Sequence, residues 1–153
     1  MKKVFAVICA VAILMSLSVT AFAANTTGGE ADITTSIAPT YTVTIPADVN
    51  VVFNATETAF GTIEVVASQI HPDKCIKVAL TTAGELNNAI DATKVIPYVI
   101  KDAEGNAFTS ATYLTEGDKT ELSIHITADD WNAAYAGEYS DTVTFIVSYE
   151  DKA

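Results

Sequence analysis

Apolar side chains alternate with polar ones along most of this chain, and this period of two constrains the fold more than any other feature. The clearest runs are residues 41–45, 76–80 and 122–126, where every second residue is apolar. In an extended strand such residues share one face, whereas a helix would spread them around its circumference. Residues 33–37, 49–53 and 63–65 follow the same period less strictly. The pattern predicts strands that each bury one face.

Turn-forming residues separate these strands. Residues 95–101 are more uniformly apolar but contain Pro97, which cannot donate a ladder hydrogen bond, so this strand is predicted at a sheet edge or with a bulge. Residues 102–106 and 115–118 carry the glycine and acidic residues of tight turns. Residues 83–93 fit either a loop or a short helix.

One segment breaks the alternation. Thr127 can cap a helix, Asp129 and Asp130 would stand in its first turn, and Gly137 lies beyond its end. A short helical turn is therefore predicted near residues 128–135. Together, seven to nine short strands and this turn predict an all-β fold, an immunoglobulin-like antiparallel β-sandwich formed by residues 31–153 as a single domain.

The last strand is predicted to be long, because alternate residues from Tyr139 to Tyr149 are apolar. Two residues depart from the pattern: Asp141 falls on the apolar face and Ile146 on the polar one. A strand of this length would cross the sandwich from end to end and act as its central element. Gly137 followed by Tyr139 also suits a structural corner, in which the tyrosine hydroxyl bonds to nearby backbone.

The first 23 residues have the three parts of a secretory signal peptide. Lys2 and Lys3 precede an apolar run over residues 4–17, and Ala21-Phe22-Ala23 supplies small residues for cleavage before Ala24. The apolar run is shorter than the ~20 residues of a spanning helix. The segment is bacterial in style. It predicts a secreted, extracellular or cell-surface protein, with residues 24–30 as a flexible leader to the first strand.

Charge and cysteine content restrict the partners. Without the predicted signal peptide, six basic and nineteen acidic residues remain, a net charge of −13. Such a surface repels phosphates and anionic lipids, so neither nucleic acid binding nor membrane insertion after signal removal is predicted. Cys75 would be the only remaining cysteine, which excludes an intrachain disulfide. No LPxTG-like motif occurs, so we expect release, or retention by other surface proteins.

Two stretches resemble known protein families. Residues 136–149, AGEYSDTVTFIVSY, resemble the closing strand of bacterial secreted β-sandwich domains of the spore-coat-U-like, fimbrial-subunit and WxL types. Residues 41–46, YTVTIP, are similar to the opening of surface proteins of Firmicutes. The chain departs from these families at two points. Without the predicted signal peptide it has only Cys75, whereas the spore-coat-U group has paired cysteines, and the WxL signature is missing because Trp131 is followed by Asn132 and Ala133. The resemblance implies a non-enzymatic surface module.

Residues that could support catalysis or metal binding are few and scattered. His71 and His125 are not at metal-ligand spacing, and no GxSxG nucleophile motif occurs. No catalytic residue, cofactor or metal is predicted, and the protein is not predicted to be an enzyme. Cys75 lies near Lys74 and Lys77, so its thiol could have a lowered pKa, although a buried strand-end cysteine is the favoured interpretation.

Two acidic segments are candidate ion sites. Asp102, Glu104 and Asn106 alternate as in a calcium loop, but Gly105 comes too early and Tyr113 stands where a bidentate glutamate belongs. A turn is therefore the favoured interpretation. Asp129 and Asp130 could also bind an ion, but helix capping accounts for them better.

Aromatic residues suggest a ligand site with two interpretations. Trp131 and Tyr135, with Tyr139, could form a platform on which a glycan stacks, as in carbohydrate-binding sandwiches. Alternatively, Trp131 closes one end of the core beneath the helical turn, which is the favoured interpretation.

The alternating segment 31–37 also has two interpretations. It could add a strand to the sheet edge of a neighbouring copy, or pair within its own domain, which is favoured because the chain can turn at Pro39. The sequence as a whole predicts a secreted or cell-surface structural or interaction module. Such a module would be a subunit of an extracellular assembly or an adhesin-like domain, acting by edge-strand and loop contacts. Its partners would be other surface proteins or its own copies. The alternative is a carbohydrate-binding β-sandwich module that binds a glycan.

Overall fold

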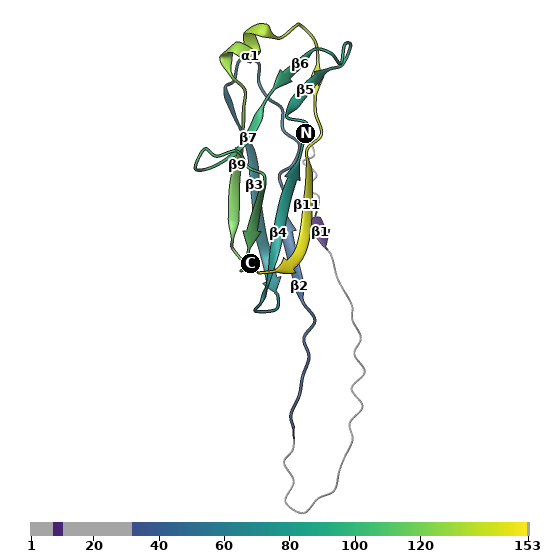
Figure 1. The fold of residues 1–153 in the computed structure, drawn as a ribbon, viewed down its shortest axis with the longest axis vertical. Helices are drawn as coiled ribbons and strands as arrows, with labels where there is room; N and C mark the ends of the chain where they lie inside the picture. The colour runs from purple at the N-terminus through teal and green to yellow at the C-terminus, as the bar shows by residue number, and fades with distance from the viewer. Residues whose placement is uncertain (1–7, 11–31, 153) are drawn as a thin grey trace, which may run out of the picture.

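The computed structural model describes residues 8–10 and 32–152, and its strands form an elongated antiparallel body (Figure 1). The all-β prediction is confirmed: strands β2–β11 form almost all the regular structure of residues 32–152, and α1 (Ala128–Ala133) is a single short helix there. Of the predicted signal peptide, only residues 8–10 are among the described residues, and the leader over residues 24–30 lies outside them.

The larger sheet has the strand order β1-β2-β3-β9-β7 with every pair antiparallel. Its strands are β1 (Ile8–Ala10), β2 (Thr40–Thr44), β3 (Glu57–Gln69), β7 (Val99–Asp102) and β9 (Lys119–His125). The β3–β9 register shifts between Ala59 and Gly61, where Gly61 has a φ of 135°. A Cβ there would press on Pro46, so this irregularity requires a glycine.

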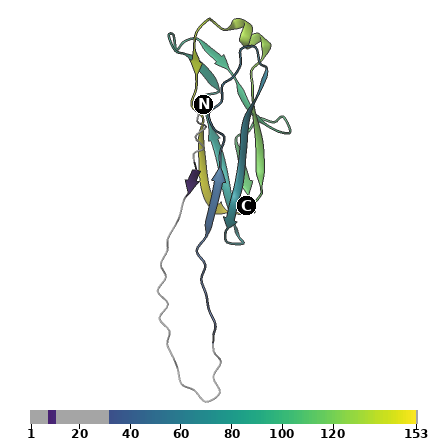
Figure 2. The same cartoon turned by 180° about the vertical axis from the view of Figure 1, so that it is seen from behind.

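Two three-stranded antiparallel sheets complete the body. The first, in the order β11-β4-β8, contains β4 (Lys74–Thr81), β8 (Ser110–Tyr113) and β11 (Thr144–Asp151). The second, β10-β5-β6, contains β5 (Glu85–Asn88), β6 (Val95–Pro97) and β10 (Tyr139–Ser140). This small sheet and α1 form one end of the body, which we call the tip, and both views place them together (Figures 1 and 2).

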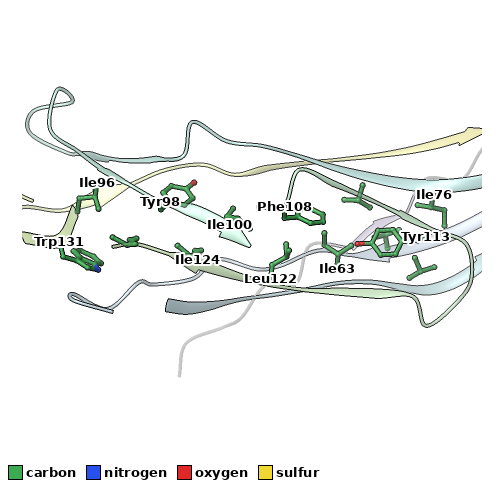
Figure 3. Close-up of a cluster of buried hydrophobic side chains, with 14 residues drawn as sticks. Ile63, Ile76, Ile96, Tyr98, Ile100, Phe108, Tyr113, Leu122, Ile124 and Trp131 are labelled. Carbon is green, nitrogen blue, oxygen red and sulfur yellow. The ribbon is translucent and has the colours of Figure 1, made fainter. Parts of the chain in front are cut away.

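The core is a long row of buried side chains between the sheets (Figure 3). The largest fully buried side chains are Ile63, Ile76, Ile96, Ile126, Val65 and Val78. Trp131 lies toward one end of this row and Tyr113 toward the other (Figure 3). The predicted alternation of residues 76–80 and 122–126 is reproduced, since Ile76 and Val78 are buried on β4, and Leu122 and Ile124 on β9.

The predicted helical turn also forms as expected. The Thr127 side chain accepts a hydrogen bond from the Asp130 backbone N–H at 3.1 Å, which satisfies one free donor of the first turn. Asp129 and Asp130 occupy that turn, where negative charge is favourable.

Several strand predictions were wrong in detail. Residues 49–53 form no strand, because the chain turns there: the Ala55 N–H donates to the Val52 carbonyl oxygen at 3.0 Å. Residues 83–93 contain β5 instead of a loop or helix. The apolar run around Pro97 is divided at Tyr98 between β6 and β7, and β6 is an edge strand, as predicted for a strand with proline.

The closing strand differs most from its prediction. It is broken into β10 and β11, which belong to different sheets, and β11 lies at a sheet edge instead of at the centre. The break contains Asp141, the polar residue that interrupted the apolar face in the sequence.

Candidate functional site

The clearest candidate for a contact surface is the side of the body where β11 forms the edge of its sheet and β2 carries only the short strand β1 on its outer side. We call it the β2–β11 margin. The ring of Tyr41 on β2 stacks on the ring of Tyr149 on β11, with centroids 5.9 Å apart. The Tyr149 hydroxyl also accepts a hydrogen bond from the His71 backbone N–H at 2.9 Å. β2 and β11 are thus held beside each other.

The β11 side of the margin is incompletely covered. Among the described ladders, β11 pairs only with β4, so its outer edge is unpaired there. Phe145 and Val147 pack against the core and Tyr149 stacks on Tyr41, but all three are only half-buried, whereas Ile76 on β4 is fully buried. An edge strand whose inner face keeps exposed apolar surface is a template for another strand.

The β2 side of the margin already carries a strand. β1 pairs antiparallel with β2, placing Ile8 opposite Thr44, Cys9 opposite Val43 and Ala10 opposite Thr42. These three residues belong to the predicted signal peptide. The outer edge of β2 therefore has the geometry to accept an antiparallel strand.

Residues 32–39 lead into β2, and we call them the N-terminal arm. None of the described ladders includes them, and the Ile33 side chain is fully exposed while that of Ile37 is 67% exposed. The arm runs outward from the end of the body opposite the tip (Figures 1 and 2). The favoured prediction, that this segment pairs within its own domain, is wrong for the described residues 32–37.

A shallow hollow lies where the N-terminal arm leaves the body. Its volume is about 240 Å³ and it is lined by Ile37, Ala38, Pro39, Gln69, Ile70, His71 and Pro72. The lining is mainly apolar and belongs to the arm and to the turn between β3 and β4. This hollow extends the margin toward the end of the body opposite the tip.

At the tip, the predicted aromatic platform does not form. Trp131 is 8% exposed; its indole N–H donates to the Ala55 carbonyl oxygen at 2.8 Å, and the ring packs edge-on against Phe53. Tyr135 is exposed, with the Lys94 ammonium 4.8 Å from its ring centroid. Trp131 therefore belongs to the core, and no surface presents both rings for a glycan.

Tyr139 and Gly137 lie at the corner between α1 and β10. The Tyr139 hydroxyl donates to the Tyr135 carbonyl oxygen at 3.0 Å and accepts from the Tyr135 N–H at 3.2 Å. Gly137 has a φ of 152° and packs directly on the buried Asn88 side chain, so that a Cβ would collide with the Asn88 amide nitrogen. The corner thus depends on the Tyr139 hydroxyl and on the absence of a side chain at Gly137.

A cluster of hydrogen bonds around the Asp141 carboxylate joins the small sheet to the rest of the body. The sequence did not predict it. Asp141 Oδ2 accepts hydrogen bonds from the Tyr98 hydroxyl at 2.5 Å and from the Thr82 hydroxyl at 2.8 Å. Thr82 follows β4, Tyr98 separates β6 from β7, and Asp141 separates β10 from β11. The cluster therefore joins three of the four crossings of the chain between the small sheet and the other two sheets, and the fourth runs from β9 through α1 to β10. The sequence signal was the carboxylate on an otherwise apolar face.

The cluster also shifts the proton affinities of its members. Burial and the hydrogen bond to Asp141 raise the pKa of Tyr98 to about 12. For Asp141, burial acts to raise the pKa, but the hydrogen bonds from Tyr98, Thr82 and the Thr142 N–H outweigh it and hold the pKa below its usual value. The cluster is therefore built for an ionised carboxylate and a neutral phenol.

The histidines and the cysteine have separate structural contacts. His71 contacts Asp73, while His125 Nε2 lies 3.0 Å from the Ser123 hydroxyl and 3.8 Å from a Glu57 oxygen. Cys75 is buried, as the favoured interpretation predicted, with its Sγ 3.7 Å from the Asp151 carbonyl oxygen.

The acidic segments form turns and caps. Asp102 accepts a hydrogen bond from the Asn106 N–H at 2.8 Å, which closes the turn of residues 102–106. Across the described ranges, no three His, Cys, Asp or Glu side chains are grouped so that they could hold a metal ion. Within the same ranges, no helix has the length and apolarity to cross a membrane.

No protein-family model matches the chain, and no curated protein sequence is significantly similar to it.

Proposed function

We propose that this protein is a secreted or cell-surface structural module, a subunit of an extracellular assembly or an adhesin-like domain that acts through strand edges and loops. The proposal rests on two observations: an unpaired N-terminal arm with two exposed isoleucines, Ile33 and Ile37, and the incompletely covered β2–β11 margin of the same body. Strand addition needs these two parts: an extended donor and an unpaired edge.

The apolar residues of the arm support the proposal. Ile33 and Ile37 are highly exposed on a chain with a strong negative charge. An exposed isoleucine gains roughly 1.5–3 kcal/mol when it becomes fully buried. Contact with a partner would provide that burial, whereas the described body does not.

The apolar surface of the tip offers a second contact region. Val52 is 64% exposed and Phe53 is 71% exposed, and the Phe53 ring packs edge-on against the ring of Trp131. Such loop residues on a rigid β body are typical of binding surfaces. The carbohydrate-binding alternative loses its main support, because Trp131 is buried.

Location is tested by expression in a bacterial host. A chain with an epitope tag in the exposed turn at Glu104 is expressed, the cells are fractionated, and intact cells are treated with protease. We expect tagged protein in the medium or on the surface, shortened by removal of residues 1–23, and protease-sensitive on intact cells. Retention of full-length protein in the cytoplasm would contradict the proposal.

Deletion of residues 24–38 then tests the role of the arm. The shortened protein should be exported and folded but should lose its large extracellular complexes, as measured by native electrophoresis and size-exclusion chromatography. A chain with Ile33 and Ile37 intact but with Tyr135→Ala at the tip serves as the control for loop contacts. If both proteins keep the same complexes, the strand mechanism does not explain them.

A further inference from the structure

We infer that residues 8–10 close the edge of β2 only while the signal peptide is attached, and that residues 32–37 of a second copy take their place after its removal. This inference rests on the proposed function and names the partner of the same margin. Processing of the chain would then switch the β2 edge from closed to open.

The acceptor half of the argument is the register of β1. Its three residues pair antiparallel with Thr42, Val43 and Thr44, which form most of β2. Predicted cleavage before Ala24 separates these residues from the body. The edge of β2 would then present unpaired N–H and C=O groups next to Val43, a core residue. Such an edge is a template for a new strand.

The donor half of the argument is the pattern of the arm. In an added strand, Ile33, Thr35 and Ile37 would share the face toward the core, and Asp32, Thr34 and Ser36 the face toward solvent. The two faces thus match the two environments beside β2. The arm leaves the body as an outstretched segment (Figure 1), and an extended segment is the form of chain that adds to a sheet edge.

The arm cannot readily serve its own β2. Only Ala38 and Pro39 separate residue 37 from the start of β2 at Thr40. Two-residue hairpins need a positive φ at the first central residue, and type I′ needs one at the second too. Ala38 would be the first central residue, and its side chain disfavours a positive φ. Pro39 would be the second, and its ring fixes φ near −65°. A second copy is therefore the occupant that the geometry favours.

Charge favours β2 over β11 as the acceptor. β2 has the sequence TYTVT and carries no charged residue, whereas β11 ends in Glu150 and Asp151. The arm contributes Asp32, which a strand added along the end of β11 would bring toward those acids. Like charges on neighbouring strands destabilise the pair.

The test uses the full chain with a specific protease site inserted between Ala23 and Ala24. Light scattering coupled to size-exclusion chromatography follows self-association before and after cleavage. Because alternate amides of an antiparallel strand face opposite neighbours, only part of the amides of Thr42, Val43 and Thr44 face β1, and the rest face β3. Hydrogen exchange follows the β1-facing amides. We expect these amides to be protected in the uncut chain. After cleavage they should be protected in associated species and exchange rapidly in the remaining monomer.

Matched variants test the face of the arm. Ile33→Asp with Ile37→Asp should raise the dissociation constant of the cleaved protein by more than about tenfold, because both side chains would be buried on association. Thr34→Asp with Ser36→Asp adds the same charge to the same segment but on the solvent face, so association should be retained. Circular dichroism checks that both variants keep the β fold.

Three results would overturn the inference. They are a cleaved chain that stays monomeric at every concentration, equal loss of association in both variants, and new protection confined to Thr144–Asp151. Rapid exchange of the β1-facing amides among Thr42–Thr44 in the uncut chain would remove the role of residues 8–10. None of these results affects the export and surface exposure measured for the proposed function, so failures of the two proposals can be told apart.

Discussion

The Asp141 cluster gives the most direct test of how the body is held together. We consider Tyr98→Phe, which removes only the phenol hydroxyl, and Asp141→Ala, which removes the carboxylate. The Tyr98 side chain is 6% exposed, and its hydroxyl donates to Asp141 at 2.5 Å. Both substitutions therefore remove the same charge-assisted hydrogen bond.

The expected magnitudes follow from the contacts. A hydrogen bond to a charged group contributes about 1.5–3 kcal/mol, so Tyr98→Phe should lower the free energy of unfolding by about 2 kcal/mol. Asp141→Ala also removes the acceptor of Thr82 and of the Thr142 N–H and should cost about 3 kcal/mol. Because both remove the shared bond, the double variant should lose about 1.5 kcal/mol less than the sum.

Urea unfolding followed by circular dichroism measures these free energies. Tyr113→Phe is the matched control, since Tyr113 is also buried but donates to the neutral Thr120 hydroxyl at 2.8 Å. It should cost about 1 kcal/mol and add to the effect of Asp141→Ala within about 0.5 kcal/mol. Additive effects of Tyr98→Phe and Asp141→Ala would refute the coupling. So would a cost of Tyr98→Phe no larger than that of Tyr113→Phe.

The same cluster predicts a loss of stability in alkali. The pKa of Tyr98 rises from 10.0 to about 12 in the folded protein, so the folded state holds this proton more tightly than the unfolded state. Its contribution is complete below pH 10 and is lost as the pH rises from 10 to 12. Asp141→Ala should lose less over this interval, because the carboxylate no longer raises the pKa of Tyr98.

Three further predictions concern other parts of the fold. Gly137→Ala should lower the free energy of unfolding by more than about 2 kcal/mol in urea, because the new methyl group meets the Asn88 amide in a backbone conformation that disfavours side chains; a neutral effect would contradict this. Trp131→Phe should cost about 2–3 kcal/mol in the same assay, through lost volume and the lost hydrogen bond to Ala55, and unchanged stability would place Trp131 outside the core. Hydrogen bonds from the N–H groups that follow β8 lower the pKa of Asp118 below 3.8, so its contribution is present above that pH and is lost as the pH falls through the lowered value; Asp118→Asn should reduce this acid sensitivity in thermal unfolding scans.

Local patterns were sufficient where local rules decide the structure. Strict alternation predicted β4 and β9, and the cap at Thr127 with its two acidic residues predicted α1. The proline rule predicted the edge position of β6. In these cases the decisive contacts lie within one element or follow from one buried face.

The remainder depended on contacts between distant residues. Sequence periodicity could not show that the chain changes sheets at Tyr98 and Asp141, because the partners that hold these breaks come from three separate segments. Residues 49–53 alternate as a strand would, but Phe53 packs on Trp131 across the tip instead of joining a ladder. The arm shows the reverse case: its alternation is typical of a strand, yet none of the described ladders includes it.

The direction of the N-terminal arm sets the symmetry of any assembly built from it. The arm continues outward from β2 and away from its own body (Figure 1). In the proposed assembly, a copy that receives an arm would therefore extend its own arm toward a third copy instead of back to the first. Such head-to-tail contacts, unless they close into a ring, build a filament with two different ends. One terminal copy would keep a vacant acceptor and the other an unused donor, so growth and capping would be chemically distinct events.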